Sequence, residues 1–215
     1  DKYSLIAEGI YEKGFTYGSL KFGAKHIQSF TKQEVQQNGV FKSDLNQMET
    51  SVFSEWNHSK DKFSCSLGLK ANRVHFSNIS INKSYYNFLP KAMLGYRLNE
   101  NSFIRYDVEM SQTNPTLVEL TDTEIRLDPY LAERGNLLLK PYSNLNNNLF
   151  YEHKKGLFTF NANLRHHYKH NPIMESVKEQ GNIFLIIPEN MKSWNKYNAE
   201  MNLKAVSYTH LRAHE

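Results

Sequence analysis

Histidines that lie close together are the first residues to consider for metal chemistry. The chain has nine histidines in 215 residues, and their one cluster is formed by His166, His167 and His170, with His153 upstream. Imidazole is a common zinc ligand when several such side chains converge on one ion. In an extended strand, however, His166 and His167 point to opposite faces. We therefore expect ordinary interfacial histidines and no metal site.

Acidic residues gather in the longest polar connector, where Asp122 and Glu124 precede Asp128. Carboxylates bind calcium, but the spacing and the glycine of an EF-hand loop are missing, so we expect a solvated loop surface. No Gly-x-Ser-x-Gly turn or other nucleophile motif occurs. The single cysteine, Cys65, excludes a disulfide within the chain and a cysteine-based zinc site. The sequence predicts a protein that is not an enzyme and has no catalytic residue, metal or cofactor.

Composition excludes several further classes. Lys plus Arg number 26 and Asp plus Glu 22, a net charge of +4 without a basic block, which argues against a nucleic-acid partner. Mean hydropathy is −0.63, and no run of about 18 apolar residues exists that could form a spanning helix. Aromatic residues make up 13%, too many for a disordered chain. Neither a signal peptide nor an initiating Met is present, so we expect a fragment.

Apolar and polar residues alternate in stretches of about ten, which is typical of β-strands whose two faces meet different surroundings. The clearest stretches are 63–72, 104–111, 158–165 and 197–204, whereas 145–152 is weaker and 3–11 alternates poorly. About nine strands of roughly ten to twelve residues are expected between Lys2 and Ala205.

Short and long connectors follow one another along the chain. The short turns lie near 13–14, 59–61, 99–101 and 154–156, and the long polar connectors span roughly 28–47, 75–87, 113–143 and 170–192. A soluble β-sandwich has shorter strands and loops of mixed length at both ends. An outer-membrane barrel has short periplasmic turns, long extracellular loops and strands of roughly ten residues. The barrel fits this sequence better.

Aromatic residues flank every short turn. The pairs are Tyr11 and Phe15, Trp56 and Phe63, Tyr96 and Phe103, and Tyr151 and Phe158. Membrane barrels carry such a girdle where the rings meet the lipid headgroups. The aromatic pairs support the barrel.

The sequence therefore predicts an all-β fold, a fragment of an antiparallel transmembrane up-and-down β-barrel. Since single-chain bacterial barrels have even numbers of strands, part of the barrel is expected to lie outside this chain. The apolar faces would meet lipid and the polar faces would line a wet lumen. The candidate lumen-facing residues are Lys70, Arg97, Arg105, Asp107, Glu109 and Arg165. They would contact a plug or a solute, or stabilise the wall through ion pairs between strands.

Local motifs between Leu20 and Ile173 resemble those of a known family. Leu20-Lys21-Phe22-Gly23-Ala24-Lys25, Ser66-Leu67-Gly68-Leu69-Lys70 and Tyr86-Asn87-Phe88-Leu89-Pro90 are similar to successive strands of the outer-membrane β-barrel family of Bacteroidetes-type TonB-dependent receptors. The passage from Tyr106 to Ser111 continues the resemblance. Its loop positions in this sequence are Asn114, Pro115, Asp128, Pro129, Tyr130, Gly135, Asn136, Lys140 and Pro141.

The resemblance implies a function. Members of the family pair a barrel of about 22 strands with an N-terminal plug. It implies the outer membrane of a Gram-negative bacterium, and uptake of a glycan, peptide or metal chelate. The implied partners are outer-membrane lipid, the plug domain of the same full-length chain, an energy-coupling inner-membrane protein that acts through the plug, and a surface substrate-binding lipoprotein.

Two alternatives stay open from the sequence. One is a plugless outer-membrane barrel that acts as an adhesin or passive channel, and the other is a soluble carbohydrate-binding β-sandwich. The tail also needs separate treatment. Residues 206–215 resemble a translated sequencing-adapter read-through, so we assign 1–205 to the partial barrel and 206–215 to a non-native tail.

Overall fold

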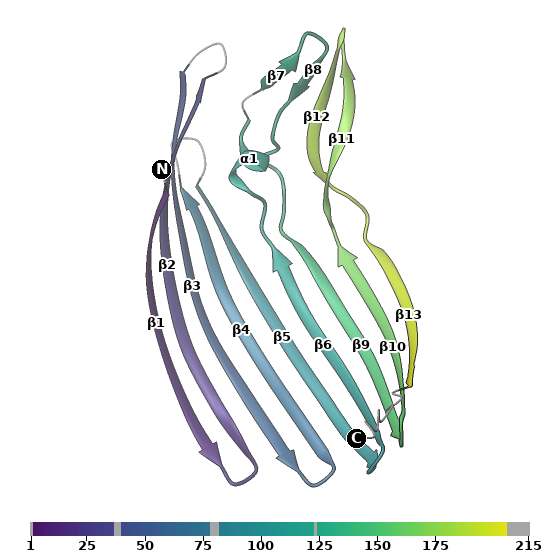
Figure 1. Ribbon diagram of the computed structural model, residues 1–215. Coiled ribbons are helices and arrows are strands. Elements are labelled where there is room, and N and C mark those ends of the chain that lie inside the picture. The colour runs from purple at the N-terminus through teal and green to yellow at the C-terminus, as the bar shows by residue number, and fades with distance from the viewer. Residues whose placement is uncertain (1, 37–39, 78–81, 123, 206–215) are drawn as a thin grey trace, which may run out of the picture.

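A large antiparallel sheet dominates the computed structural model, which describes residues 2–36, 40–77, 82–122 and 124–205. Figure 1 shows the sheet as a curved wall, with short turns at one end and long connectors at the other. Nine strands of the described residues follow one another in the order β1 (Lys2–Phe15), β2 (Gly18–Gln36), β3 (Val40–Lys60), β4 (Phe63–Ser77), β5 (Asn82–Asn99), β6 (Ser102–Thr113), β9 (Tyr142–Lys155), β10 (Phe158–His170) and β13 (Trp194–Ala205). The predicted number of strands is confirmed, whereas the predicted tail at 206–215 lies outside the described residues.

Several strands are longer than the sequence predicts. Strands β2, β3 and β5 have 19, 21 and 18 residues. The expected connector at 28–47 is wrong, because β2 and β3 stay paired there up to Gln36 and Val40. The connector at 75–87 is shortened for the same reason, since β4 runs to Ser77 and β5 begins at Asn82. Alternation marks only the part of a strand that has one apolar face, whereas backbone pairing continues between polar residues.

The two remaining connectors, expected at 113–143 and 170–192, contain secondary structure that the sequence analysis did not predict. They form the helix α1 (Leu117–Leu120) and a second sheet in the order β11 (Ile173–Gln180), β12 (Ile183–Asn190), β8 (Leu131–Glu133) and β7 (Ile125–Asp128). Strands β8 and β12 pair in parallel, although they come from different connectors. We call residues 114–122, 124–141 and 171–193 the cap, which lies beyond the ends of the main strands (Figure 1).

The register of the main sheet sorts its side chains onto two faces, because residues directly opposite on neighbouring strands share a face. Among the main-sheet residues whose side chains the structure describes, the acidic ones all lie on one face, which we call the polar face: Glu8, Glu12, Glu49, Glu55, Asp107, Glu109, Glu152 and Glu200. The other face, called the apolar face, carries residues such as Leu67, Leu164 and Leu203. Leu67 and Leu164 are 44% and 49% exposed, so no second layer covers them among the described residues.

The cap packs on the polar face near the long-connector end of the sheet. Leu120 of α1 and Leu139 are fully buried against Val74 and Phe76 of β4. The Lys83 ammonium of β5 donates to the Leu137 carbonyl. The cap is thus attached to the polar face, and this contact is the main apolar core that joins it to the wall.

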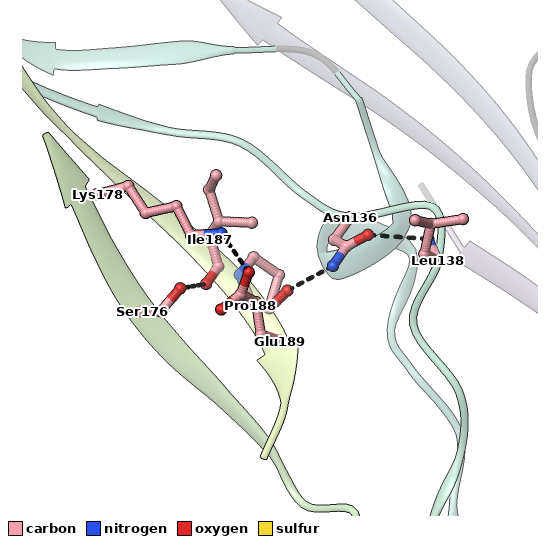
Figure 2. A network of polar contacts seen from close by, with 7 residues as sticks. All are labelled: Asn136, Leu138, Ser176, Lys178, Ile187, Pro188 and Glu189. Carbon is pink, nitrogen blue, oxygen red and sulfur yellow. Dashed lines mark hydrogen bonds and ion pairs between the residues drawn. The ribbon is translucent and has the colours of Figure 1, made fainter. Parts of the chain in front are cut away.

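Polar contacts join the two connectors within the cap. In Figure 2 the Asn136 amide donates to the Pro188 carbonyl at 3.0 Å, while its oxygen accepts from the Leu138 backbone N–H at 2.9 Å. The Lys178 ammonium donates to the Glu189 carboxylate and holds its pKa below the ordinary value. Asn190 adds a further bridge, since its oxygen accepts from the Lys140 N–H and its amide donates to the Lys140 and Asn171 carbonyls. The second sheet is therefore one unit built from two connectors.

Gly135 fixes the approach of the chain to α1. Its N–H donates to the Thr121 carbonyl, and the next N–H, of Asn136, donates to the Glu119 carbonyl. An added Cβ at Gly135 would lie 2.4 Å from the Thr121 oxygen and 2.6 Å from the Glu119 oxygen. These are backbone atoms, so they cannot rotate away.

We predict that Gly135→Ala loosens the cap without unfolding the main sheet. Overpacking of this kind costs about 1–3 kcal/mol. The opening free energy measured by hydrogen exchange at the amides of residues 135 and 136 should therefore fall by that amount in the full-length protein. Gly9→Ala is the matched control, because nothing lies within 4 Å of a Cβ added there. Unchanged exchange in the Gly135→Ala protein would contradict this account of the cap.

Candidate functional site

A pocket of about 450 Å³ lies where the cap meets the polar face. It is bounded by β3, β4, β5, the end of β6 and the first residues of the connector that follows. Its lining residues are Gln47, Glu49, Lys70, Asn72, Val74, Phe76, Asn87, Leu89, Gln112, Asn114, Pro115 and Thr116. The strand register brings Asn72 directly opposite Asn87. The cap begins at Asn114, so the pocket is formed jointly by sheet and cap.

The charges of the pocket compensate each other. The Lys70 ammonium lies 3.7 Å from the Glu49 carboxylate, and the Asn72 amide donates to the same carboxylate at 3.0 Å. Since a carboxylate only accepts hydrogen bonds, this contact fixes the Asn72 amide group, with its nitrogen toward Glu49. The two charged residues that line the pocket therefore leave it neutral.

Three carboxamide oxygens of the pocket lack a partner. The Oδ1 atoms of Asn72, Asn87 and Asn114 are buried and accept no hydrogen bond from any described residue. Asn87 as a whole is 4% exposed. Leaving a buried carbonyl oxygen unpaired is costly.

The predicted lumen-facing residues Lys70, Arg97, Arg105, Asp107, Glu109 and Arg165 all lie on the polar face. Arg105 donates to Asp107 at 2.9 Å, and Arg165 lies 3.7 Å from Glu200. Glu109 stands opposite Lys91, whose ammonium pairs with Glu55. Of the six, only Lys70 lines the pocket. Ion pairs between and along strands thus occupy much of this face.

The family-motif positions all lie in the cap, and two of them also line the pocket. Asn114 and Pro115 line the pocket, and Pro115 is fully buried. The remaining positions lie elsewhere in the cap: Asp128, Pro129, Tyr130, Gly135, Asn136, Lys140 and Pro141. The Asp128 carboxylate accepts from the Tyr130 N–H at 2.7 Å and so forms a local turn. Most contacts of these positions are with the cap itself.

Sequence reasoning missed Glu49, Asn72 and Asn87 as pocket residues. They sit at ordinary polar positions of alternating strands, and their sequence neighbours do not distinguish them from other such positions. Only the register, which brings β3, β4 and β5 together, places them around one space.

The histidines and the loop acids have separate partners. His166 stacks on Tyr197, with ring centres 4.6 Å apart, whereas His167 bonds Asn146 on the other face. Asp122 lies 4.0 Å from Arg134, and Glu124 lies 4.0 Å from Arg126. Across the part of the chain that the structure describes, no three His, Cys, Asp or Glu side chains form a group that could hold a metal ion.

The aromatic residues beside the short turns lie mostly on the apolar face, where Lys13 and Lys60 stand near the rings of Phe15 and Tyr17. One predicted position is wrong. Phe103 lies on the polar face, opposite Arg97. Its ring covers Gly95, where an added Cβ would lie 3.1 Å from the ring. Because Gly95 has no side chain, the neighbouring strand leaves space for the Phe103 ring.

Comparison with known protein families gives the identity of this wall. Residues 9–209 match the outer membrane protein beta-barrel family. The chain belongs to this family. The barrel chain is therefore an outer-membrane protein, which confirms the predicted fold and location and rules out the soluble β-sandwich. The narrower resemblance to the Bacteroidetes-type branch stays a prediction. A search of the curated proteins found no match, and no helix among the described residues is long and apolar enough to cross a membrane.

Solved structures share the fold of the barrel chain. The copper transporter OprC superimposes with a TM-score of 0.71 at 10% identity, over 96% of this chain and 36% of that protein. The ferric enterobactin receptor PfeA of Pseudomonas aeruginosa superimposes with a TM-score of 0.70 at 16% identity, over 93% of this chain and 33% of the receptor. The FrpB iron transporter of Neisseria meningitidis superimposes with a TM-score of 0.66 at 12% identity, over 96% of this chain and 33% of the transporter. The chain spans about a third of the length of these proteins.

We predict that the apolar face of the barrel chain meets lipid, because none of the main-sheet residues on this face whose side chains the structure describes is acidic. On this basis Leu67→Arg should lower the folding free energy in a bilayer by about 1–4 kcal/mol, the cost of an arginine between the interface and the midplane. Ser66→Arg is the control, since residue 66 lies on the polar face one position away. Denaturant titration of the full-length protein folded into lipid vesicles measures both. An equal loss in the two variants would contradict the assignment of the faces.

Proposed function

We propose that this chain forms part of the wall of a TonB-dependent outer-membrane receptor that takes up a nutrient. The observation that carries the proposal is the sorting of charge onto one face together with the packing of the cap on that same face. In a closed barrel the charged face would line the lumen, and the cap would stand at the entrance of the lumen. The shared fold with receptors and transporters of metals and siderophores supports the same conclusion.

The six charged residues of the polar face are proposed to line the lumen. Lys70, Arg105 and Arg165 have acidic partners close by, so their first role is to stabilise the wall. A plug domain of the full-length chain would lie against this face and meet an array of compensated charges. An inner-membrane energy-coupling protein would act through that plug, and a surface lipoprotein would deliver a glycan, peptide or metal chelate.

The second candidate function is a plugless barrel that serves as an adhesin or a passive channel. It shares the wall and the cap, so a functional experiment must separate the two. In the source bacterium, the full-length gene that contains this chain is deleted in one strain, and the energy-coupling protein is deleted in another. Growth of both strains is measured on single nutrients.

We expect both deletions to abolish growth on the same nutrient, because transport through a plugged barrel needs energy coupling. A passive channel would leave growth intact without the energy-coupling protein, and an adhesin would leave growth intact in both strains. Either result would overturn the proposal.

A further inference from the structure

We propose that the apolar face, at its edge nearest the long connectors, binds the phosphate group of a lipid headgroup. The site consists of Arg73 and His75 of β4 with Ser84 and Tyr86 of β5, and we call it the headgroup site. Since the apolar face is predicted to meet lipid, such a site would hold one lipid of the outer leaflet in place. The inference goes beyond the proposed function, because it needs neither a plug nor a transported solute.

Strand register places the four side chains of the headgroup site together on the apolar face. Arg73 stands directly opposite Tyr86, and His75 stands directly opposite Ser84. Arg73 and His75 continue the alternation of Leu67 along β4, so they share its face. Arg73 is exposed, and Tyr86 is 72% exposed. The cap packs on the opposite face of the same strands and leaves the headgroup site open.

The headgroup site lies at the height expected for the outer headgroups of the membrane. Phe63 begins β4 beside a short turn, and Arg73 follows ten positions later. At about 3.3 Å per residue this separation is roughly 33 Å along the strand, or about 25 Å of height at the usual tilt of barrel strands. The apolar band of a membrane barrel is also about 25 Å tall. The side chains of this face between the two residues are all apolar: Cys65, Leu67, Leu69 and Ala71. Arg73 is therefore the first residue of β4 on this face beyond the apolar band.

No carboxylate of the described residues compensates the charge of Arg73. Its guanidinium donates to the Ser84 hydroxyl at 3.2 Å, and its central carbon lies 5.8 Å from the centre of the Tyr86 ring. The acidic residues of the main sheet whose side chains the structure describes lie on the polar face, where two of them pair with Arg105 and Arg165. An anion that compensates Arg73 must come from outside the described residues, and lipid headgroups supply one at this height.

The contacts of Arg73 leave it ready to bind phosphate. A guanidinium carries five N–H donors in a planar fork, and Ser84 uses one of them, so donors remain for two phosphate oxygens. The Ser84 hydroxyl also bonds the Nδ1 atom of His75 at 3.0 Å. The Nε2 atom of His75 has no hydrogen-bond partner among the described residues and can donate when it carries a hydrogen. The Tyr86 ring restrains the guanidinium by a cation–π contact.

The surroundings of the headgroup site favour a lipid over free phosphate. Thr50 of β3 stands opposite Arg73, and its hydroxyl bonds the ring of His26 on β2 at 2.8 Å. Polar groups thus form one row across four strands. On the short-turn side of this row, Val52 and Phe88 are 56% and 58% exposed. A lipid matches this border, because its headgroup meets the polar row and its acyl chains meet the apolar side chains.

Native mass spectrometry of the full-length protein, purified in detergent, tests the proposal. The probes are monophosphorylated lipid A, its dephosphorylated form with the same acyl chains, and inorganic phosphate. We expect Arg73→Gln to weaken binding of the phosphorylated lipid about tenfold, because charge-assisted bonds to phosphate are lost. Binding of the dephosphorylated lipid should not change. Arg73→Lys keeps the charge but lacks the planar fork, so it should cause a smaller loss.

Two control variants each remove one positive charge elsewhere. Arg97→Gln lies on the polar face. Lys60→Gln lies on the apolar face, but beside a short turn and near the Tyr17 ring. Each should change the affinity for the phosphorylated lipid less than twofold. Because Arg73 is exposed and forms no ion pair with a described residue, Arg73→Gln should unfold in denaturant as the parent does.

Four outcomes would overturn the inference. The parent binds both lipids equally, or Arg73→Gln binds the phosphorylated lipid as well as the parent does. A control variant weakens binding as much as Arg73→Gln, which would indicate general attraction between charges. Inorganic phosphate displaces the lipid at equal concentration, which would make free phosphate the ligand. None of these outcomes depends on energy coupling, so the growth experiment tests the proposed function separately.

Discussion

The backbone hydrogen-bond ladder is the constraint on which the rest of this structure depends. In a membrane every backbone N–H and C=O must be paired within the protein, and strands achieve this with their neighbours. Pairing also fixes which side chains share a face, because successive residues of a strand alternate in direction. One layer can therefore meet lipid on one side and water on the other. The acidic residues of the main sheet whose side chains the structure describes follow this division, from Glu8 in β1 to Glu200 in β13.

The cap adds what a simple wall lacks. Two connectors far apart in the sequence pair through β8 and β12, and Asn136 and Asn190 join them by side-chain hydrogen bonds. The unit then packs Leu120 and Leu139 on the polar face of β4. A buried apolar contact on an otherwise polar face holds the cap in one position, and the pocket lies beside that contact. Unpaired carboxamide oxygens also lie elsewhere on the polar face, at Asn144, Asn148, Asn161 and Asn163.

Much of the wall was predictable because its signal is local. The alternation at 63–72 and 158–165, the short turns and the aromatic residues beside them predict the nine strands and their two faces. The failures also have physical causes. Polar residues in the β2–β3 hairpin pair as well as apolar ones, so the strands run beyond the alternating part. Phe103 lies on the polar face because the alternation of β6 puts it on the side of Arg105 and Asp107, and Gly95 on the next strand leaves room for its ring.

By itself the sequence determined which residues share a face of a strand, since that depends only on a period of two. It could not determine which residues of different strands meet, since that depends on register and on contacts between distant segments. Glu49, Asn72 and Asn87 look alike as polar positions until the pairing of β3, β4 and β5 brings them together. The position of Asn114 depends further on the packing of the cap. Only the tertiary structure therefore decided that these side chains surround one pocket.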